Sequence, residues 1–263
     1  MCIRDRIDKI YIPTLSRVGN QITWDNLPDF VKEISVLAIP SKEENLHKGI
    51  PTVTVPDEFT GIAKTREWLW SISENLKWGM FDDDLKFSVR TPNGETSKRE
   101  FTNEDWKDLL DTTDSWLEDF FVVGVRQGNL PPRGKDYIEN SNINTVYFFN
   151  GKKLPKVNKL DWSLQFAEDL HLNLQLLKSG YKNRIWDKYV FMGTQYAEGG
   201  CSDTRTIETI NESHEKLMEK HPGYVKWNGI TKGVLGGDMK KIRVSYKKAY
   251  ADSWNSTLGN FYE

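Results

Sequence analysis

The chain of 263 residues is long for one domain and short for two, which favours a single α/β domain with elaborations. Its hydrophobic content of 38% is sufficient for a core, and its net charge of -2 excludes a uniformly basic nucleic-acid-binding protein. Cys2 and Cys201 are the two cysteines, too few and too far apart for a disulfide framework or a zinc site.

The N-terminal segment bears on origin and compartment. Residues 1–6 resemble the translation of a transposase-end adaptor found in metagenomic gene predictions, so we expect natural sequence, forming one domain, over residues 7–263. Such an origin is consistent with a bacteriophage gene. The segment lacks the apolar stretch of a secretory signal, and no run of about 18 apolar residues follows. We therefore expect a cytoplasmic protein, in the infected bacterial host cell if a phage encodes it.

Short apolar runs alternate with helical patterns in the first third of the chain. The runs predict strands over residues 9–13, 34–39, 52–56 and 78–81. Helical spacing predicts helices over residues 24–32 and 61–75. This alternation is typical of a Rossmann-like α/β fold with a mainly parallel central sheet flanked by helices, in which ligands bind beyond the carboxyl ends of the strands. Asp82, Asp83 and Asp84 directly follow one strand and so lie at such an end.

The rest of the chain continues in the same way. Further helices are predicted over residues 103–119, 166–180 and 206–221, and further strands over residues 120–125, 143–149 and 184–192. Asn103 is expected to cap its helix, with Asp105 in the first turn. Residues 90–99 predict a hairpin tip or a mobile loop, and residues 128–142 predict a loop; both segments are candidates to close over bound donor and acceptor. Residues 206–263 form a basic C-terminal elaboration of the same domain.

The aspartate triplet is the strongest chemical signal. Three adjacent carboxylates repel one another and raise each other's pKa, and a bound cation removes that penalty. Mg²⁺ and Mn²⁺ usually take one or two carboxylates together with substrate phosphates. Lys64 and Arg66, on the preceding predicted helix, could meet the phosphates or the base of such a ligand. The competing interpretation is a solvated acidic turn, and the residues alone leave both open.

Four short motifs follow one another along the chain. They are Ile10-Tyr-Ile-Pro-Thr-Leu-Ser-Arg17, Gly61-Ile-Ala-Lys-Thr-Arg66, Phe81-Asp-Asp-Asp-Leu85 and Glu168-Asp169-Leu-His-Leu-Asn-Leu-Gln-Leu-Leu-Lys-Ser-Gly-Tyr181. In this order they resemble the GT-A glycosyltransferases, especially the family two-like branch, whose metal motif is Asp-x-Asp. The resemblance implies a GT-A fold and the transfer of a sugar from a UDP-sugar with Mn²⁺ or Mg²⁺.

The resemblance also implies a role for each matching residue. Contacts with the nucleotide sugar are implied for Thr14, Ser16, Arg17, Lys64, Arg66, Asp82 and Asp83. Asp84 is implied as the metal ligand, with Asp82 or Asp83 assisting. Asp169, or else Glu168, is implied as the general base that deprotonates the acceptor hydroxyl in an inverting transfer. Without the resemblance, two acids in a first helical turn that complement the helix dipole are the simpler interpretation.

Three histidines are candidates for a further ligand of the metal ion. Some enzymes of this fold recruit a late histidine to the metal, and His214 and His221 are the candidates here. His171 is two residues beyond Asp169 and points to another side of the helix, so we expect it to pack or to lie at the surface. For all three, packing is the more common role.

A narrower resemblance concerns the acceptor. Ile12-Pro-Thr-x-x-Arg17, Gly61-x-x-x-x-Arg66-x-Trp68, the aspartate triplet, and Gly199-Gly200-Cys201 followed by Arg205 are similar to phage glycosyltransferases encoded beside TET-type dioxygenases. Members of that group add sugars to 5-hydroxymethylcytosine in DNA. The resemblance implies this acceptor, reached by base extrusion or in a bent duplex. Tyr196, Gly199, Gly200 and Arg205 are then expected at the acceptor wall.

The last fifty residues could hold the DNA backbone and stack a displaced base. Their basic residues are Lys216, Lys220, Lys226, Lys232, Lys240, Lys241, Arg243, Lys247 and Lys248, interleaved with Tyr224, Trp227, Tyr246 and Tyr250. A solvated helix and strand face is the alternative.

Three other functions remain open at this level. The same chemistry could act on a glycan, a protein or a lipid, although the lack of an apolar span argues against lipid. A non-catalytic nucleotide- or DNA-binding module is a second possibility, against which the intact aspartates and the Glu168-Asp169 pair argue. A nucleotidyltransferase is a third, and the chain lacks the Gly-rich phosphate loop expected at its start.

Overall fold

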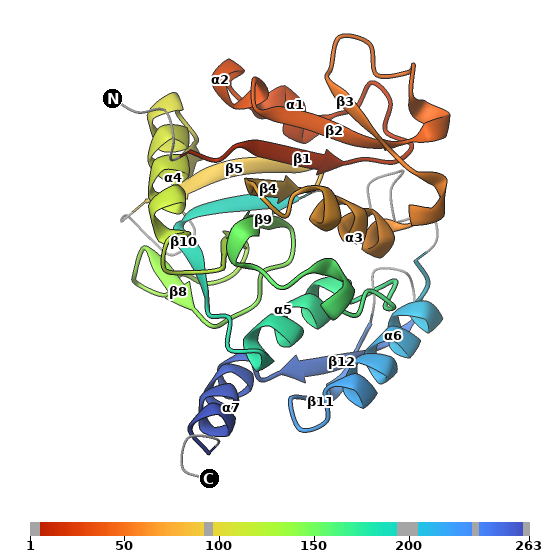
Figure 1. Ribbon diagram of the computed structural model, residues 1–263, viewed down its shortest axis with the longest axis vertical. Helices are drawn as coiled ribbons and strands as arrows, with labels where there is room; N and C mark the ends of the chain where they lie inside the picture. The colour runs from red at the N-terminus through yellow and green to blue at the C-terminus, as the bar shows by residue number, and fades with distance from the viewer. Residues whose placement is uncertain (1–5, 92–96, 194–204, 233–236, 260–263) are drawn as a thin grey trace.

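A ten-stranded sheet forms the centre of the molecule, with helices on both of its faces (Figure 1). The computed structural model describes residues 6–91, 97–193, 205–232 and 237–259. The strand order is β3-β2-β1-β4-β9-β7-β10-β5-β6, with β8 paired to β10. The strands are β1 (Lys9–Pro13), β2 (Ser35–Pro40), β3 (Thr52–Val55), β4 (Lys77–Phe81), β5 (Leu85–Arg90), β6 (Lys98–Glu100), β7 (Val122–Gln127), β8 (Tyr137–Glu139), β9 (Val146–Asn150) and β10 (Asn183–Gly193).

The strand directions confirm the predicted α/β fold with a mainly parallel sheet. From the pairings, β1 to β4, β6, β7 and β10 run in one direction, whereas β5, β8 and β9 run in the other. The parallel half, β3-β2-β1-β4, is the half predicted from the alternation of apolar runs and helices. β1, β2 and β4 are buried on both faces, as such strands are in α/β proteins, whereas β3 at the sheet edge is only partly buried.

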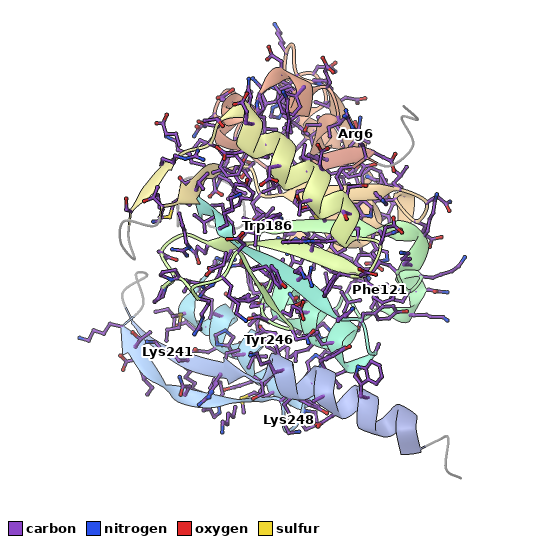
Figure 2. All side chains as sticks on the ribbon, turned by 90° about the vertical axis from the view of Figure 1, so that its left-hand side faces the viewer. Arg6, Phe121, Trp186, Lys241, Tyr246 and Lys248 are labelled. Atoms are coloured by element: carbon purple, nitrogen blue, oxygen red, sulfur yellow. The ribbon has the colours of Figure 1, made fainter. Side chains whose placement is uncertain are left out.

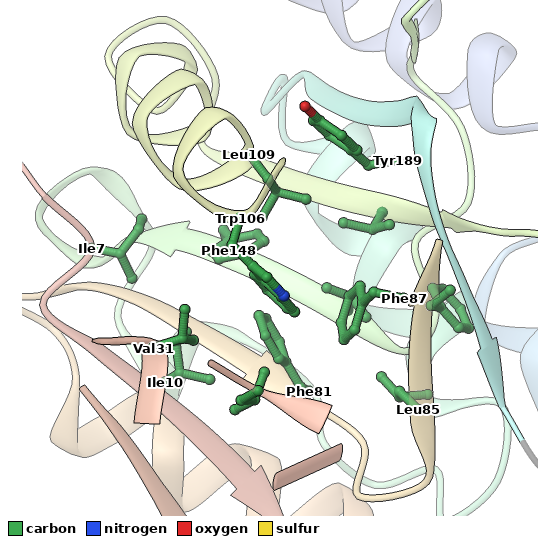
Figure 3. Packing of buried hydrophobic residues seen from close by; sticks show 14 of the residues in the cluster. Ile7, Ile10, Val31, Phe81, Leu85, Phe87, Trp106, Leu109, Phe148 and Tyr189 are labelled. Carbon is green, nitrogen blue, oxygen red and sulfur yellow. The ribbon is translucent and has the colours of Figure 1, made fainter. Parts of the chain in front are cut away.

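Helices cover both faces because successive strand residues point to opposite sides. The helices beside the central sheet are α1 (Ile22–Asn26), α2 (Asp29–Lys32), α3 (Ile62–Ile72), α4 (Asn103–Trp116) and α5 (Glu168–Lys178), with short 3₁₀ turns η1 (Ser41–Glu43), η2 (Asp57–Phe59), η3 (Gly151–Lys153) and η4 (Val157–Lys159). On one face Trp106 of α4 packs against Phe87, at 4.7 Å between ring centroids, in the cluster of Figure 3. On the other face Trp70 of α3 packs against Phe149, at 5.0 Å.

Several local predictions need correction. The helix expected over residues 24–32 is two short helices, because Pro28 lacks an amide hydrogen and interrupts it. Thr102, rather than Asn103, caps α4: its side chain accepts a hydrogen bond from the Asp105 amide in a capping box. β5 was not predicted, although its buried residues alternate as in a strand with one exposed face.

The antiparallel pairing of β5 with β6 confirms the hairpin predicted around residues 90–99, whereas the predicted loop over residues 128–142 contains a short strand. The stretch 90–99 holds the end of β5 and the start of β6, and residues 92–96 lie outside the described part of the chain. The stretch 128–142 contains β8, which pairs with β10. Closure of these segments over a ligand stays a prediction.

The C-terminal residues form a small layer at one end of the molecule (Figure 1). It consists of α6 (Ile207–Lys220), α7 (Tyr246–Gly259) and a separate hairpin of β11 (Val225–Lys232) and β12 (Asp238–Val244). Leu217 and Val225 pack there against Leu174 and Leu177 of α5 in one hydrophobic cluster. Among the described residues, the structure contains no helix with the length and apolar character that a membrane span requires.

Candidate active site

A cavity of about 740 Å³ lies where β1, β2, β3 and β4 end, and extends to the start of α5. Ligands bind at this edge of α/β sheets. Nine residues predicted from the sequence line it together: Thr14, Arg17, Arg66, Asp82, Asp83, Asp84, Glu168, Asp169 and Arg205. They come from five separate parts of the chain, so the fold assembles the cavity that the motifs indicated.

Asp83 is fully engaged by the first strand and the loop that follows it. Thr14 donates a hydrogen bond of 2.6 Å to one carboxylate oxygen, and Arg17 lies 2.5 Å from the other. Burial raises the pKa of Asp83, and the bonds from Thr14 and Arg17 act in the opposite direction. Arg17 also lies 3.4 Å from Asp84, so the cation holds both acids at the strand end. Asp83 therefore anchors the loop. Asp82 and Asp84 also line the cavity, and each has only a longer contact with one arginine.

Thr23 shapes the turn that carries the triplet. Its hydroxyl donates to the carbonyl of Asp82 at 2.5 Å and accepts from the amide of Leu85 at 2.8 Å. Its own amide donates to the carbonyl of Asp83 at 2.9 Å. The side chain is completely buried. Sequence reasoning missed Thr23, because a buried threonine in a short helix carries no signal of a contact with residues some sixty positions later.

Arg66 joins the two halves of the cavity. Its guanidinium lies 3.2 Å from Asp82 and 3.0 Å from Glu168. It also lies 5.8 Å from the centre of the Tyr147 ring. The residue is only 3% exposed, yet its Nε and Nη1 make no geometrically sound hydrogen bond with described residues. Buried N–H groups of this kind are normally satisfied, so they indicate a ligand with oxygen acceptors.

The first turn of α5 brings two acids into the cavity. Ala167, at the helix start, has a φ of 60°, a left-handed conformation that a residue with a Cβ seldom adopts. Such strain persists where the surrounding fold imposes it, often at functional sites. Glu168 then contacts Arg66, and the side chain of Asn173 ties the helix to the carbonyl groups of Asp169 and Ile143.

Two carboxyl groups of the cavity titrate near neutrality. Burial raises the pKa of Asp82 to about 7, against the effect of Arg66, and the neighbouring carboxylates raise it further. Burial, followed by the charge of Glu168, raises the pKa of Asp169 to about 7. Perturbed acids in a cleft are typical of catalytic sites.

The described lining is too acidic to receive a diphosphate unaided. It contains six acids (Asp57, Asp82, Asp83, Asp84, Glu168 and Asp169) and four cations (Arg17, Lys42, Arg66 and Arg205). Over the described residues, no group of three or more His, Cys, Asp or Glu side chains is arranged to hold a metal by itself. Asp82 and Asp84 nevertheless fit a Mg²⁺ or Mn²⁺ ion that takes its other ligands from substrate phosphates.

Other predicted residues lie elsewhere. The exposed ammonium of Lys64 lies 2.5 Å from Glu67, and the residue does not line the cavity. Ser16 stands beside the cavity in a left-handed conformation, with its amide bonded to Glu43. Tyr196, Gly199, Gly200 and Cys201 lie outside the described residues.

The histidines also lie away from the cavity lining. His171 and His221 are buried against each other, at 2.7 Å between ring nitrogens. His171 is thus packed, one of the two alternatives expected for it. The ring of His214 lies 3.0 Å from the carbonyl of Lys240.

The cavity has further walls that the sequence did not single out. Pro40, Val55 and Phe59, from the ends of β2 and β3 and from η2, form an apolar side next to Thr14. Gln127, Asn144 and Gln165 add uncharged polar groups to the lining. These residues share no sequence motif, so only the fold brings them together.

The sequence model of the TET-associated glycosyltransferase family matches residues 8–200. The chain is 26% identical, over 233 residues, to a β-glucosyl-HMC-α-glucosyl-transferase of Enterobacteria phage T6, covering 82% of each chain. It is 25% identical to the protein of the same name from phage T2, over 253 residues and 89% of each chain.

Similarity to solved structures is weaker. A UDP-glucose pyrophosphorylase from Acinetobacter baumannii aligns with a TM-score of 0.43 at 9% identity, over 82% of this chain and 95% of that one. An inositol-1-phosphate CTP transferase from T. maritima aligns with a TM-score of 0.41 at 10% identity, over 81% and 97%. The family match spans well over half of the chain and confirms the predicted enzyme class. This protein belongs to the TET-associated glycosyltransferase family and is a glycosyltransferase.

Proposed function

We propose that the protein transfers a sugar from a UDP-sugar, with Mn²⁺ or Mg²⁺, to hydroxymethylcytosine in DNA. The observation that carries this proposal is the array Asp82, Arg66 and Glu168, which joins an acidic strand end to the acids of α5 inside one cavity. The T6 and T2 relatives are named for transfer to glucosylated HMC, which supports this acceptor.

The donor half of the cavity is formed by the strand ends. The apolar side of Pro40, Val55 and Phe59 suits a nucleoside. The buried Nε–H groups of Arg17 and Arg66, which have no hydrogen-bond partner among the described residues, suit its phosphates. Asp84 and Asp82 would hold the cation, which neutralises charge on the departing diphosphate. Arg66 orients Asp82 and would also stabilise the negative charge of the departing diphosphate. Its guanidinium is already fixed beside Asp82 and need not move during the reaction.

The acceptor half is formed by α5 and its surroundings. Glu168 lies 3.0 Å from Arg66 and is held as its counter-ion, whereas no described cation lies within ion-pair distance of Asp169. With a pKa of about 7, Asp169 can accept the proton of an acceptor hydroxyl near neutral pH. We therefore propose Asp169 as the base. Arg205, whose charge acts on Asp169, would face the same acceptor.

The relatives' names suggest a second acceptor. They specify a glucosyl group already attached to HMC, so the reacting hydroxyl of those acceptors belongs to a sugar. Gln127, Asn144 and Gln165 are uncharged polar residues of the kind that bind sugar hydroxyls, and they line this half of the cavity. A sugar on the base also extends farther from the duplex than a hydroxymethyl group, which reduces the need for base extrusion.

Nucleoside mass spectrometry tests the proposal. The protein is incubated with a panel of UDP-sugars and Mn²⁺ on three duplexes, which carry cytosine, 5-hydroxymethylcytosine or its β-glucosylated form. We expect an added hexose-sized mass on a modified duplex only, and its loss with a chelator. Transfer to glycans or proteins but to none of the duplexes would refute the DNA acceptor.

The anomeric form of the product tests the role of Asp169. A single displacement assisted by a base inverts the configuration of the sugar carbon. The relatives' names specify an α-glucosyl product, which would retain the configuration of an α-linked donor. An α product from such a donor would exclude Asp169 as the base of a one-step inversion.

A further inference from the structure

We propose that the outer face of the β11–β12 hairpin, formed by Lys226, Lys241 and Arg243, binds the phosphate backbone of the DNA duplex whose base is glycosylated. This inference rests on the proposed function, because it takes DNA as the acceptor. It adds the surface that holds the duplex, which lies outside the cavity described above.

The pairing of the hairpin determines which side chains face outward. Ile242 and Val244 of β12 pack against the hydrophobic cluster on α5 and α6, so these alternate residues face inward. Lys241 precedes Ile242, and Arg243 lies between Ile242 and Val244, so both point to the opposite face, away from the helices. Both are exposed. Lys226 stands directly opposite Arg243 and shares that outer face. Figure 2 shows Lys241 on the hairpin at the edge of the molecule.

The three outer cations form no ion pair with the described residues, whereas Lys240 lies 2.9 Å from Glu215 on the inner side. Lys226 and Arg243 are like charges in directly opposite positions, an arrangement that destabilises a hairpin. A bound anionic partner would remove the repulsion between these two side chains, which explains why the hairpin carries like charges at paired positions.

Charge is also segregated along the chain. Residues 225–244 contain five cations (Lys226, Lys232, Lys240, Lys241 and Arg243) and one acid (Asp238), a net charge of +4, in a protein of net charge -2. The duplex backbone is the matching partner, since it presents a negative charge about every 1.7 Å of helix axis.

The hairpin lies next to the active site. Gly237 and Asp238, at the start of β12, line a second cavity of about 520 Å³ together with Arg205. Arg205 lines the main cavity as well. The turn end of the hairpin, where Lys232 pairs with Asp238, thus lies at the rim of the proposed acceptor half, and Lys226 and Arg243 are paired at its other end. The hairpin lies beyond residues 8–200, the segment that matches the family.

The aromatic residues of this region favour backbone contact over base stacking. Tyr224, Tyr246 and Tyr250 pack against the hydrophobic cluster and are not free to stack on a base. Trp227 is 40% exposed, with the Lys240 ammonium 5.3 Å from its ring centre. The side chains of this region that are free to contact DNA are therefore mainly cations, which bind phosphates.

Fluorescence anisotropy with an unmodified duplex at several salt concentrations tests this surface. The variant is Lys226→Gln with Lys241→Gln and Arg243→Gln. We expect it to bind at least about tenfold more weakly at low salt, with a slope of log K against log salt that is smaller by about 2 to 3. Its KM for hydroxymethylated DNA should rise while its turnover of the UDP-sugar with water is unchanged. Neutralisation removes a like-charge pair, so the thermal midpoint should not fall.

A matched pair of single variants separates position from total charge. Lys241→Gln and Lys107→Gln each remove one exposed cation, the latter from α4 at the opposite end of the molecule (Figures 1 and 2). Only Lys241→Gln should weaken binding. Equal effects of the two, or wild-type affinity and slope in the triple variant, would overturn the inference while sugar transfer to DNA continued. No DNA binding or transfer by the wild type would overturn the proposed function itself, and this inference with it.

Discussion

The guanidinium of Arg66 lies 3.0 Å from the carboxylate of Glu168, although the two residues belong to helices far apart in the chain. Both side chains are largely withdrawn from water, at 4% and 12% exposure. The contact joins α3, which borders the proposed donor half of the cavity, to α5, which borders the proposed acceptor half. Arg66 is therefore the residue whose loss should affect both substrates.

Replacement of Arg66 should be severe even by lysine. An ammonium group cannot reach Asp82 and Glu168 together, because it lacks the planar fork of guanidinium. We expect Arg66→Lys to lower kcat/KM by about 100-fold, and Arg66→Met also to lose about 3 kcal/mol of stability by leaving Glu168 unpaired. Transfer kinetics and thermal unfolding measure the two effects. Restored stability in Arg66→Met with Glu168→Gln, without restored activity, would support a catalytic role of the cation.

Asp84 and Asp83 should differ in their effects although they are neighbours. Asp84→Asn should abolish most of the Mn²⁺-dependent activity and weaken Mn²⁺ binding in the presence of UDP, because Asp84 is a proposed ligand. Asp83→Asn should mainly destabilise the protein, because it breaks the bonds from Thr14 and Arg17. Isothermal titration with Mn²⁺ and UDP compares them. Unchanged Mn²⁺ affinity in Asp84→Asn would exclude it as a ligand.

Asp169 should govern the pH dependence of the rate. Its pKa of about 7 predicts that kcat/KM rises with pH and levels off above 7, because the carboxylate is the active form of a base. Asp169→Asn should lower kcat/KM by about 10²- to 10⁴-fold and remove this rise. The measurement that decides is the pH dependence of the residual kcat/KM of Asp169→Asn. A profile that still rises through pH 7 would assign the titration to another group.

The same carboxyl group should affect stability in the absence of ligands. The pKa of Asp169 is about 7 in the folded protein and about 3.9 in an unfolded chain. Between these values the folded state binds more protons, so its contribution to stability falls as pH rises from about 4 to 7. Asp169→Asn should lessen this fall. Unfolding midpoints at pH 5 and pH 8, for wild type and variant, show whether it does.

Thr23→Val should impair donor binding from a buried position. The change keeps the volume but leaves the Leu85 amide without its acceptor, at a cost of about 1 to 3 kcal/mol. We expect a raised KM for the donor, because the turn at Asp82 loses the bond from the Thr23 hydroxyl to the Asp82 carbonyl. The bond from the Thr23 backbone amide to the Asp83 carbonyl remains in the variant. Thr113→Val is the matched control, since Thr113 is equally buried and accepts from Trp186 away from the cavity. Equal changes in KM would mean that loss of stability alone is responsible.

Local patterns in the chain predicted much of the N-terminal half. Buried parallel strands are continuous apolar runs, and so β1, β2 and β4 were recognisable, as was the acidic strand end at Asp82. The two short helices on either side of Pro28 were predicted as one, and the strand β5 was missed. Segments this short carry a weak periodic pattern, and tertiary packing determines whether they form a helix or a strand.

The division of roles within the acidic cluster required the tertiary structure. Sequence could not show that Thr14 and Arg17 occupy Asp83, or that Lys64 turns toward Glu67 while Arg66 turns inward. These choices depend on the distances between segments that the sheet places side by side, and a linear pattern does not contain those distances.

The sequence by itself determined the fold class, the position of the acids at a strand end and the membership of a glycosyltransferase family, because apolar periodicity and short motifs are local properties. Only the tertiary structure decided which acid is an anchor, which is paired and which titrates near neutrality, and that the outer cations of the hairpin have no described partner. Those properties depend on burial and on the distance between charges, and both arise only when remote segments pack together.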